Sequence, residues 1–456
     1  MSDDDAFESS FVFRARRALL PEGIRPADVV TRGARIAAVV EKGAADEPDA
    51  EIIEVGGDLL MPGLVDTHVH VNDPGRAGWG GFEPVMGAAA AGGITTLVDM
   101  PLNSIPATTS VAALAAKRAA CEAPVLHRVG CAFWGGVVPG NAGELEGLAR
   151  AGVRGFKCFL VPSGVDEFAH VGEADLAIAM PILARLGLPL LVHAESPAAI
   201  AAVAPAASAD PRRYTTWLDA RPAAAEVEAV RMMLRLCEST RCAVHVVHLS
   251  AAEALQDLRA ARARGLPVTV ETCPHYLTFA AEEIGDGATE FKCAPPIRGR
   301  ANRERLWEAL RAGDIDMIVS DHSPCVPELK HGESGDFVAA WGGIESLAVS
   351  VAATWAEAQR RGFTVADLAR WMSAKPAALA GFGGRKGVIA PGADADLIAW
   401  NPDAEWTVDG RKLPHRNPVS PYEGRSVRGV VHITVAGGEW VTGHAATPLD
   451  RMGPSR

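Results

Sequence analysis

The sequence lacks the paired cysteine spacings that mark zinc fingers and redox motifs: its eight cysteines are spread singly along 456 residues. Such a pattern is typical of reduced thiols rather than of a disulfide framework. No uninterrupted apolar run approaches the roughly 20 residues that cross a bilayer. The first ten residues, MSDDDAFESS, are acidic and polar, the reverse of a signal peptide. We therefore expect a cytoplasmic protein with no membrane partner.

Positive charge is also scarce, because 44 Lys and Arg residues face 56 Asp and Glu residues, a formal net charge of −12. A protein that binds the phosphate backbone needs a cationic face, so we expect no nucleic-acid partner. Hydrophobic residues make up 48% of the chain and charged residues 22%, as in ordinary globular proteins. A sizeable buried core is therefore expected, and a disordered chain is excluded.

Two β-rich regions at the ends of the chain flank a middle of different character. The short alternating runs of the first sixty residues return near the C-terminus in KGVIAPGADADLIAW and VRGVVHITVAGGEWV. Chain ends that flank an inserted domain tend to lie close together. We therefore expect one small β-sandwich domain built from residues 1–62 and 385–456, with a separate domain over residues 63–384.

The middle of the chain alternates eight β-branched runs with Ala-, Leu- and Arg-rich stretches of helical composition. The runs lie at 63–70, 93–100, 125–133, 153–160, 188–195, 243–250, 266–273 and 315–322. Eight strands separated by helices predict a (β/α)8 TIM barrel, which gathers the carboxyl ends of all its strands at one mouth. A doubly wound open sheet is the alternative, and it would bind ligands at a topological switch point.

Five of these eight runs end in side chains that can bind a metal ion. His68 and His70 are two residues apart, and alternate residues of a strand point the same way, so both can face one ion. The other four runs end with Lys157, His193, His248 and Asp321. A single histidine in a strand is more often structural. The shared position at the same ends of the strands favours a metal site at the barrel mouth.

Lys157 needs a separate explanation, because an ammonium group among imidazoles would repel a divalent ion. Burial lowers the pKa of a lysine, and its neutral amine can add carbon dioxide to form a carbamate. The two carbamate oxygens can reach two metal ions ~3.5–4 Å apart. The alternative is a lysine that reaches solvent or pairs with a carboxylate.

Several other histidines are expected to be structural. His245 precedes His248 by three residues, so we expect it on the opposite face of its strand, toward the helices. His127 lies early in its strand, and His444 lies in the C-terminal β-region. His275 and His322 could be structural or could support the metal ligands.

These motifs together resemble the cyclic amidohydrolases of the amidohydrolase superfamily. The segments that carry the resemblance are VDTHVH at 65–70, GFK at 155–157, VVHLS around His248 and SDHSPC around Asp321, with His193. Further segments most resemble the allantoinase group: PGRAGWGGFEP, ETCPHYL, KCAPPIR and SPYEG. The resemblance spans nearly the whole sequence and supports the barrel with a β-sandwich.

The resemblance implies a centre of two divalent metal ions whose ligands are His68, His70, Lys157, His193, His248 and Asp321. His68 and His70 would hold the more buried ion, and His193 and His248 the second. Lys157, as N6-carboxylysine formed with CO2, would bridge both ions. Zinc is the expected metal, with iron, cobalt or manganese as alternatives, and a homotetramer is the expected assembly.

The implied reaction is hydrolysis of the cyclic amide of allantoin to allantoate in purine catabolism, with Asp321 as the general base. Asp321 would take a proton from water and deliver it to the leaving nitrogen. The candidates for contacts with this small-molecule substrate are Asn72, Asn103, Ser323, Gly342 and Gly343.

Two related groups of enzymes remain alternatives. Dihydroorotases carry an arginine where this chain has Asn72 and an asparagine where it has Ala294. The bidentate clamp that would bind the carboxylate of dihydroorotate is therefore missing at these two positions. Arg76 or Arg298 could replace it. Hydantoinases and dihydropyrimidinases typically carry a tyrosine shortly after the bridging lysine, and residues 159–163 contain none. A non-catalytic scaffold relative would lack metal ligands, whereas every expected ligand type is present here.

Overall fold

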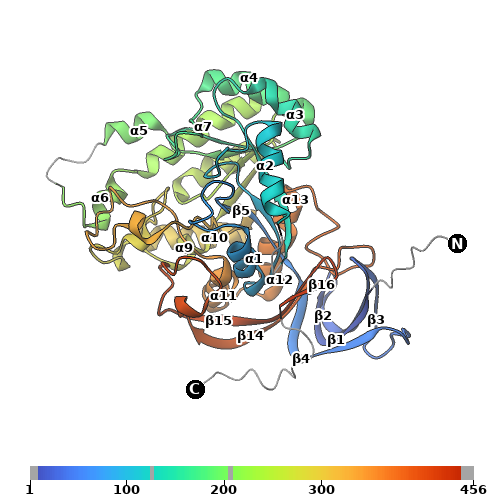
Figure 1. The fold of residues 1–456 in the computed structure, drawn as a ribbon. Helices are drawn as coiled ribbons and strands as arrows, with labels where there is room; N and C mark the ends of the chain where they lie inside the picture. Colours follow the sequence, from blue (N-terminus) through green and yellow to red (C-terminus); the bar gives the residue numbers. More distant parts are fainter. Residues whose placement is uncertain (1–8, 124–127, 204–208, 443–456) are drawn as a thin grey trace.

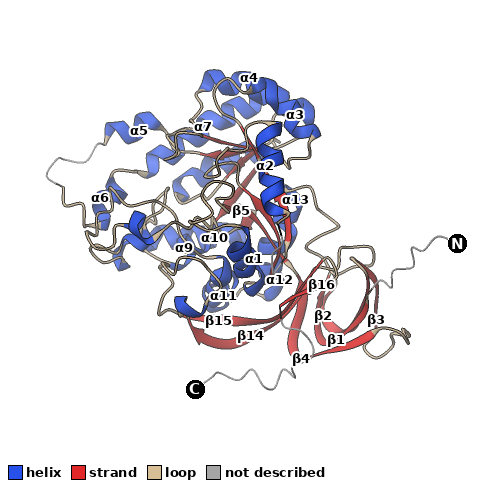
Figure 2. Cartoon of the chain, in the orientation of Figure 1, coloured by secondary structure: helices blue, strands red, loops and turns tan. Residues whose placement is uncertain are grey.

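The computed structural model describes residues 9–123, 128–203 and 209–442. A larger lobe alternates strands with helices, and a smaller lobe beside it is built mainly from strands (Figures 1 and 2). His127 and His444 lie outside the described residues. None of the helices in the described ranges combines the length and the apolar character that crossing a membrane requires.

The larger lobe is a closed barrel of parallel strands, as predicted. Its strands are β5 (Leu64–Val69), β6 (Ile94–Asp99), β7 (Gly130–Phe133) continued by β8 (Gly135–Gly136), β9 (Phe156–Phe159), β10 (Leu190–His193), β11 (Val244–Val246), β12 (Val268–Thr272) and β13 (Met317–Ile318). Each pairs in parallel with the next. The ring closes where Val69 bridges His322 and the His70 amide donates to the His322 carbonyl at 2.8 Å. This closure excludes the open sheet.

Strands β5, β6, β9 and β10 are buried along their whole length, because helices cover the outside of the barrel (Figure 2). The helices are α1 (Phe82–Ala91), α2 (Val111–Cys121), α3 (Leu145–Arg150), α4 (Glu173–Leu186), α5 (Pro197–Ala202), α6 (Tyr214–Asp219), α7 (Ala223–Thr240), α8 (Leu255–Ala263), α9 (Pro274–Thr278), α10 (Arg300–Ala312), α11 (Ser350–Arg360), α12 (Val365–Ala369) and α13 (Lys375–Leu379). Because both faces of such strands are buried, their sequences are near-continuous apolar runs rather than alternating ones.

The smaller lobe joins both ends of the described chain in one seven-stranded sheet, ordered β16-β15-β14-β4-β1-β2-β3. Its strands are β1 (Ser10–Leu20), β2 (Gly23–Arg32), β3 (Arg35–Val40), β4 (Glu51–Pro62), β14 (Leu397–Thr407), β15 (Ser426–Ala436) and β16 (Glu439–Thr442). The two ends meet where β4 and β14 pair antiparallel, with Met61 opposite Ile398. The sheet has a hydrophobic core of its own, which includes Phe13, Ile36 and Val435. The domain boundaries proposed above stay a prediction.

Candidate metal centre

The histidines and the aspartate selected from the sequence surround one cavity at the carboxyl ends of the barrel strands. His68 lies on β5, His193 is the last residue of β10, and His70, His248 and Asp321 lie just beyond the ends of β5, β11 and β13. All five line a cavity of about 290 Å³. The parallel barrel explains this convergence, because every strand ends at the same mouth.

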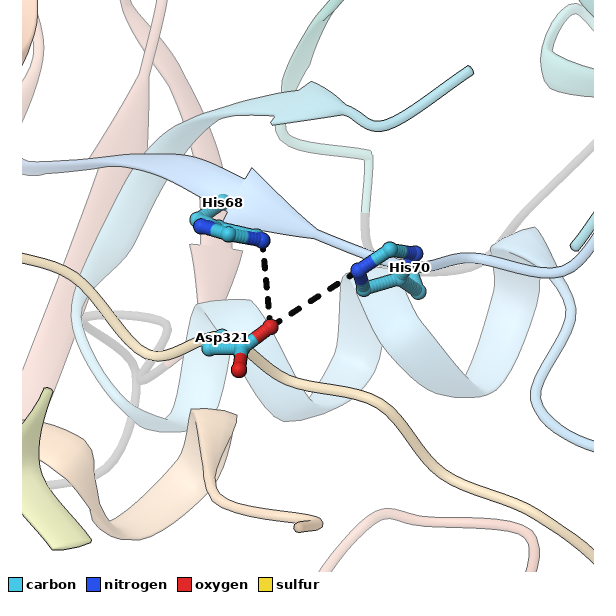
Figure 3. A group of neighbouring side chains, drawn as sticks. All are labelled: His68, His70 and Asp321. Carbon is cyan, nitrogen blue, oxygen red and sulfur yellow. Dashed lines mark ion pairs between the residues drawn. The ribbon is translucent and has the colours of Figure 1, made fainter. Parts of the chain in front are cut away.

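His68, His70 and Asp321 form the tightest group of potential ligands. One Asp321 oxygen, Oδ1, lies 3.1 Å from His68 Nε2 and 3.7 Å from His70 Nε2 (Figure 3). One ligand atom from each residue lies within 4.8 Å of the others. The three side chains could therefore hold one ion between them.

A second pair of imidazoles lies next to this group. The His193 and His248 ring centroids are 4.6 Å apart, and the His68 and His248 ring centroids are 5.3 Å apart. Burial lowers the pKa of His70, His193 and His248, which favours the neutral imidazole that binds metal ions. The two groups of ligands thus offer neighbouring positions for two ions.

Two of the potential ligands, His248 and Asp321, have a left-handed backbone conformation at the mouth of the barrel. His248 has a φ of 37° and Asp321 a φ of 47°, which non-glycine residues rarely adopt. Such conformations cost energy and tend to occur at functional sites. Burial opposes the ionisation of Asp321, but the nearby imidazoles, chiefly His68, outweigh it and hold the pKa of Asp321 well below its usual range. Asp321 is therefore ionised, and its carboxylate oxygens could bind a metal ion.

Lys157 lies on β9 with its side chain fully buried. Its Nζ has no hydrogen-bond partner in the described part of the chain and lies 5.0 Å from the Phe159 ring centroid. A lysine that reaches solvent or pairs with a carboxylate is therefore excluded for this structure. Burial lowers the pKa of Lys157 to about 8, so a neutral, carboxylatable amine is accessible near neutral pH.

The set of donors fits a pair of divalent ions. Imidazole nitrogens and carboxylate oxygens are ordinary ligands of zinc and of the first-row transition metals. The buried Lys157 Nζ and His248 Nδ1 both lack a hydrogen-bond partner within the described ranges. Buried polar groups are nearly always hydrogen-bonded, so unpartnered donors at this place indicate a missing partner such as an ion or a carboxyl group on the lysine.

The sequence analysis did not identify two buried glutamates that contact the histidines. Glu195, two residues after His193, accepts a hydrogen bond from His193 Nε2 at 2.6 Å and is also paired with Arg221. This contact leaves His193 Nδ1 free for a metal ion. The two-residue spacing on the strand was a signal that could have suggested this support.

Glu271, on β12, supports His68 in the same way. Its Oε1 lies 2.5 Å from His68 Nδ1, and its Oε2 lies 2.9 Å from His245 Nε2. Burial opposes the ionisation of Glu271, but the imidazoles of His68 and His245 outweigh it and lower the pKa of Glu271 to about 2. His68 therefore donates from Nδ1 and keeps Nε2 for a metal ion.

The prediction that His245 faces the helices is wrong. His245 shares Glu271 with His68 and therefore points into the barrel. The strand β11 ends at Val246, and the positive φ of His248 breaks the alternation on which the prediction depended. Three residues of separation thus do not place His245 and His248 on opposite faces.

The two ambiguous histidines differ in their surroundings. His322 Nδ1 accepts a hydrogen bond from the Ser346 amide at 3.2 Å, which is a structural contact. His275 is buried, and neither of its ring nitrogens has a partner among the residues that the structure describes. With Cys273, it forms a second group of potential ligands that shares Asp321 with the first.

Four of the five candidate substrate contacts line the cavity: Asn103, Ser323, Gly342 and Gly343. Asn72 is not among the lining residues. It is buried, and its side-chain amide donates to the Pro324 carbonyl at 3.2 Å, which holds the neighbouring loop. Asn72 is therefore placed to support the cavity wall rather than to contact a ligand.

Two buried lysines donate hydrogen bonds to backbone carbonyls of the segment 338–343, which forms part of the cavity wall. Lys292 Nζ donates to the Val338 carbonyl at 2.9 Å and to the Ala340 carbonyl at 2.5 Å. Lys330 Nζ donates to the Trp341 carbonyl at 3.1 Å and to the Gly343 carbonyl. These contacts were not predicted, because no local sequence pattern indicates which backbone carbonyls a buried lysine contacts.

The two arginines that could have replaced a carboxylate clamp are engaged elsewhere. Arg76 pairs with Glu167, and Arg298 pairs with Glu226 at 2.6 Å. Both guanidinium groups already have a carboxylate partner.

The closed (β/α)8 barrel carries histidines, an aspartate and a buried lysine at the carboxyl ends of its strands, a site that could hold divalent metal ions for a hydrolase. The chain belongs to the Amidohydrolase family, whose model matches residues 59–441.

Similar proteins extend this assignment over nearly the whole chain. An allantoinase of Streptomyces avermitilis is 50% identical over 97% of this chain and 98% of its own length. An allantoinase of Arabidopsis thaliana is 44% identical over 96% of this chain and 89% of its own length. The solved structure of an L-hydantoinase (dihydropyrimidinase) from Arthrobacter aurescens has a TM-score of 0.89 and 30% identity, and covers 95% of this chain and 96% of its own.

Proposed function

We propose that this protein is an allantoinase, which hydrolyses the ring amide of allantoin to give allantoate. The observation that carries the proposal is the 50% identity, over nearly the full length of both chains, with a relative that bears this name. Five of the six expected ligands, all except Lys157, line one cavity, which argues against a scaffold without catalysis.

The residues that would hold two divalent ions are His68, His70, carboxylated Lys157, His193, His248 and Asp321. When bound, such a pair of ions lowers the pKa of a water molecule and polarises the carbonyl of the substrate. Zinc is the ion that we propose, and the homotetramer and the cytoplasmic location stay predictions.

Asp321 is the one carboxylate among the described residues that line the cavity, and it is ionised. During hydrolysis the water oxygen bonds to the ring carbonyl carbon, and the bond from that carbon to the ring nitrogen breaks. Asp321 would take the proton from the water and pass it to the departing nitrogen. Asn103 and Ser323, which line the same cavity, would bind the polar groups of the substrate.

Hydrolysis of hydantoins or dihydropyrimidines is the second candidate, because the L-hydantoinase structure is so similar. Dihydroorotate is disfavoured, since Arg76 and Arg298 are both paired with glutamates and no free bidentate clamp remains at these positions.

Side-by-side assays of the purified enzyme with allantoin, hydantoin, dihydrouracil and dihydroorotate test the proposal. We expect the highest kcat/KM with allantoin, its loss after removal of divalent ions by a chelator, and its return with zinc. A higher kcat/KM with any of the other three substrates would replace the proposed activity.

A further inference from the structure

Glu271 contacts ligands from both proposed metal positions. Its Oε1 lies 2.5 Å from His68 Nδ1 and accepts a second hydrogen bond, at 3.2 Å, from the backbone amide of His248. His68 belongs to the first group of ligands and His248 to the second. One carboxylate oxygen therefore joins the two groups.

The two contacts fix different properties of the ligands. The bond to His68 Nδ1 sets the tautomer and the ring orientation, which leaves Nε2 toward Asp321. The bond to the His248 amide stabilises a backbone with a φ of 37°, which is strained for a residue with a side chain. Without this acceptor, the backbone turn that points His248 into the mouth loses its support.

Glu271 is itself held in place by His245. Its second oxygen, Oε2, lies 2.9 Å from His245 Nε2, and His245 Nδ1 lies 2.7 Å from Thr269 Oγ1. Both oxygens of the buried carboxylate are thus engaged, and the chain Thr269, His245, Glu271 leaves it little freedom to rotate.

Glu195 provides a matched comparison within the same mouth. It is also a fully buried glutamate bonded to a histidine ligand, but it contacts His193 alone among the proposed ligands, and its other partner is Arg221. The two glutamates have the same chemistry and differ in how many ligand groups they contact.

We propose that Glu271 is a positioning residue that couples the two metal positions, so that its loss weakens the binding of both ions. Glu195 supports one position only. The proposal rests on the metal centre of the proposed function.

The experiment compares Glu271→Gln and Glu195→Gln with the wild-type enzyme by zinc titration of the metal-free full-length chain. Loss of such supporting contacts typically lowers metal affinity about 10–100-fold. We expect this loss for both ions in Glu271→Gln and for one ion in Glu195→Gln. Excess zinc should restore part of the turnover of Glu271→Gln, which a general folding defect would not allow.

The zinc titration tests the coupling separately from allantoin hydrolysis, because metal affinity is measured without substrate. Loss of one ion or of none in Glu271→Gln would overturn the coupling, even if the wild type binds two ions and hydrolyses allantoin. A wild-type chain that binds no zinc would overturn the coupling and the metal centre together.

A milder variant keeps the proposal testable if Glu271→Gln does not fold. Thr269→Val removes the hydroxyl that holds His245 and leaves the carboxylate intact. We expect a smaller decrease in affinity, again for both ions, with unchanged circular dichroism of the metal-free chain. Unchanged affinity for either ion in a folded Thr269→Val chain would contradict the coupling.

Discussion

Two fully buried lysines in the same barrel have opposite surroundings. Lys117, on α2, donates to Asp99 Oδ2 at 2.6 Å and to the Met100 carbonyl at 2.8 Å. Lys157 is equally buried, but its Nζ has no hydrogen-bond partner in the described chain. A buried charge without a partner is costly, so Lys117 can stay charged beside Asp99, whereas the surroundings of Lys157 favour its neutral form.

The largest expected effect is that of Lys157→Ala. The variant removes the proposed bridge between the ions, so we expect loss of bound metal and of allantoin hydrolysis to the background rate, with the fold retained. Added short-chain carboxylic acids should restore part of the activity by replacing the carbamate. Wild-type metal content and turnover in this variant would remove Lys157 from the mechanism.

Asp321→Asn should have the next largest effect. The amide keeps the size of the side chain but cannot carry the proton, so we expect kcat to fall about 10²–10⁴-fold, the usual contribution of a general base. At least one ion should remain, since the four histidines are unchanged. Metal analysis and steady-state kinetics on one preparation check both points, and an unchanged kcat would exclude Asp321 as the proton carrier.

Lys117→Met tests the structural half of the comparison. The substitution leaves Asp99 buried without its cation, which typically costs about 3–5 kcal/mol of the free energy of unfolding. We expect a lower denaturation midpoint with unchanged metal content and kcat. A double variant, Lys117→Met with Asp99→Asn, should regain part of the stability. Loss of metal at unchanged stability would contradict the structural assignment.

The smallest effect concerns pH. The pKa of Lys157 is about 8, lowered by burial, so the neutral fraction of the amine rises from about one-tenth at pH 7 to about nine-tenths at pH 9. Carboxylation requires the neutral amine, so at constant dissolved CO2 its rate in the metal-free chain should rise roughly tenfold over this range. Carbon-13 NMR with labelled bicarbonate measures the carbamate, with Lys157→Ala as the control. Equal rates at pH 7 and pH 9 would contradict this view.

The sequence predicted the elements whose pattern is local. The eight strands were recognisable from β-branched runs, and the HxH spacing of His68 and His70 gave their common direction. The β domain built from both ends of the chain was predicted from the short alternating runs of the first sixty residues, which recur near the C-terminus.

Features that depend on tertiary contacts could not be predicted. Glu271 supports His68 across 203 residues of sequence, and no local spacing indicates such a pair. The direction of His245 was misjudged because β11 stops after three residues. The bond from the Asn72 side chain to the Pro324 carbonyl, 252 residues away, is likewise not visible in the sequence.

A crystal structure of the zinc-loaded enzyme tests the central claim most directly. We predict a carboxyl group on Lys157 Nζ that lies between two anomalous peaks, one beside His68 and His70 and the other beside His193 and His248. An unmodified Lys157 Nζ in a fully active, metal-loaded crystal would contradict the account.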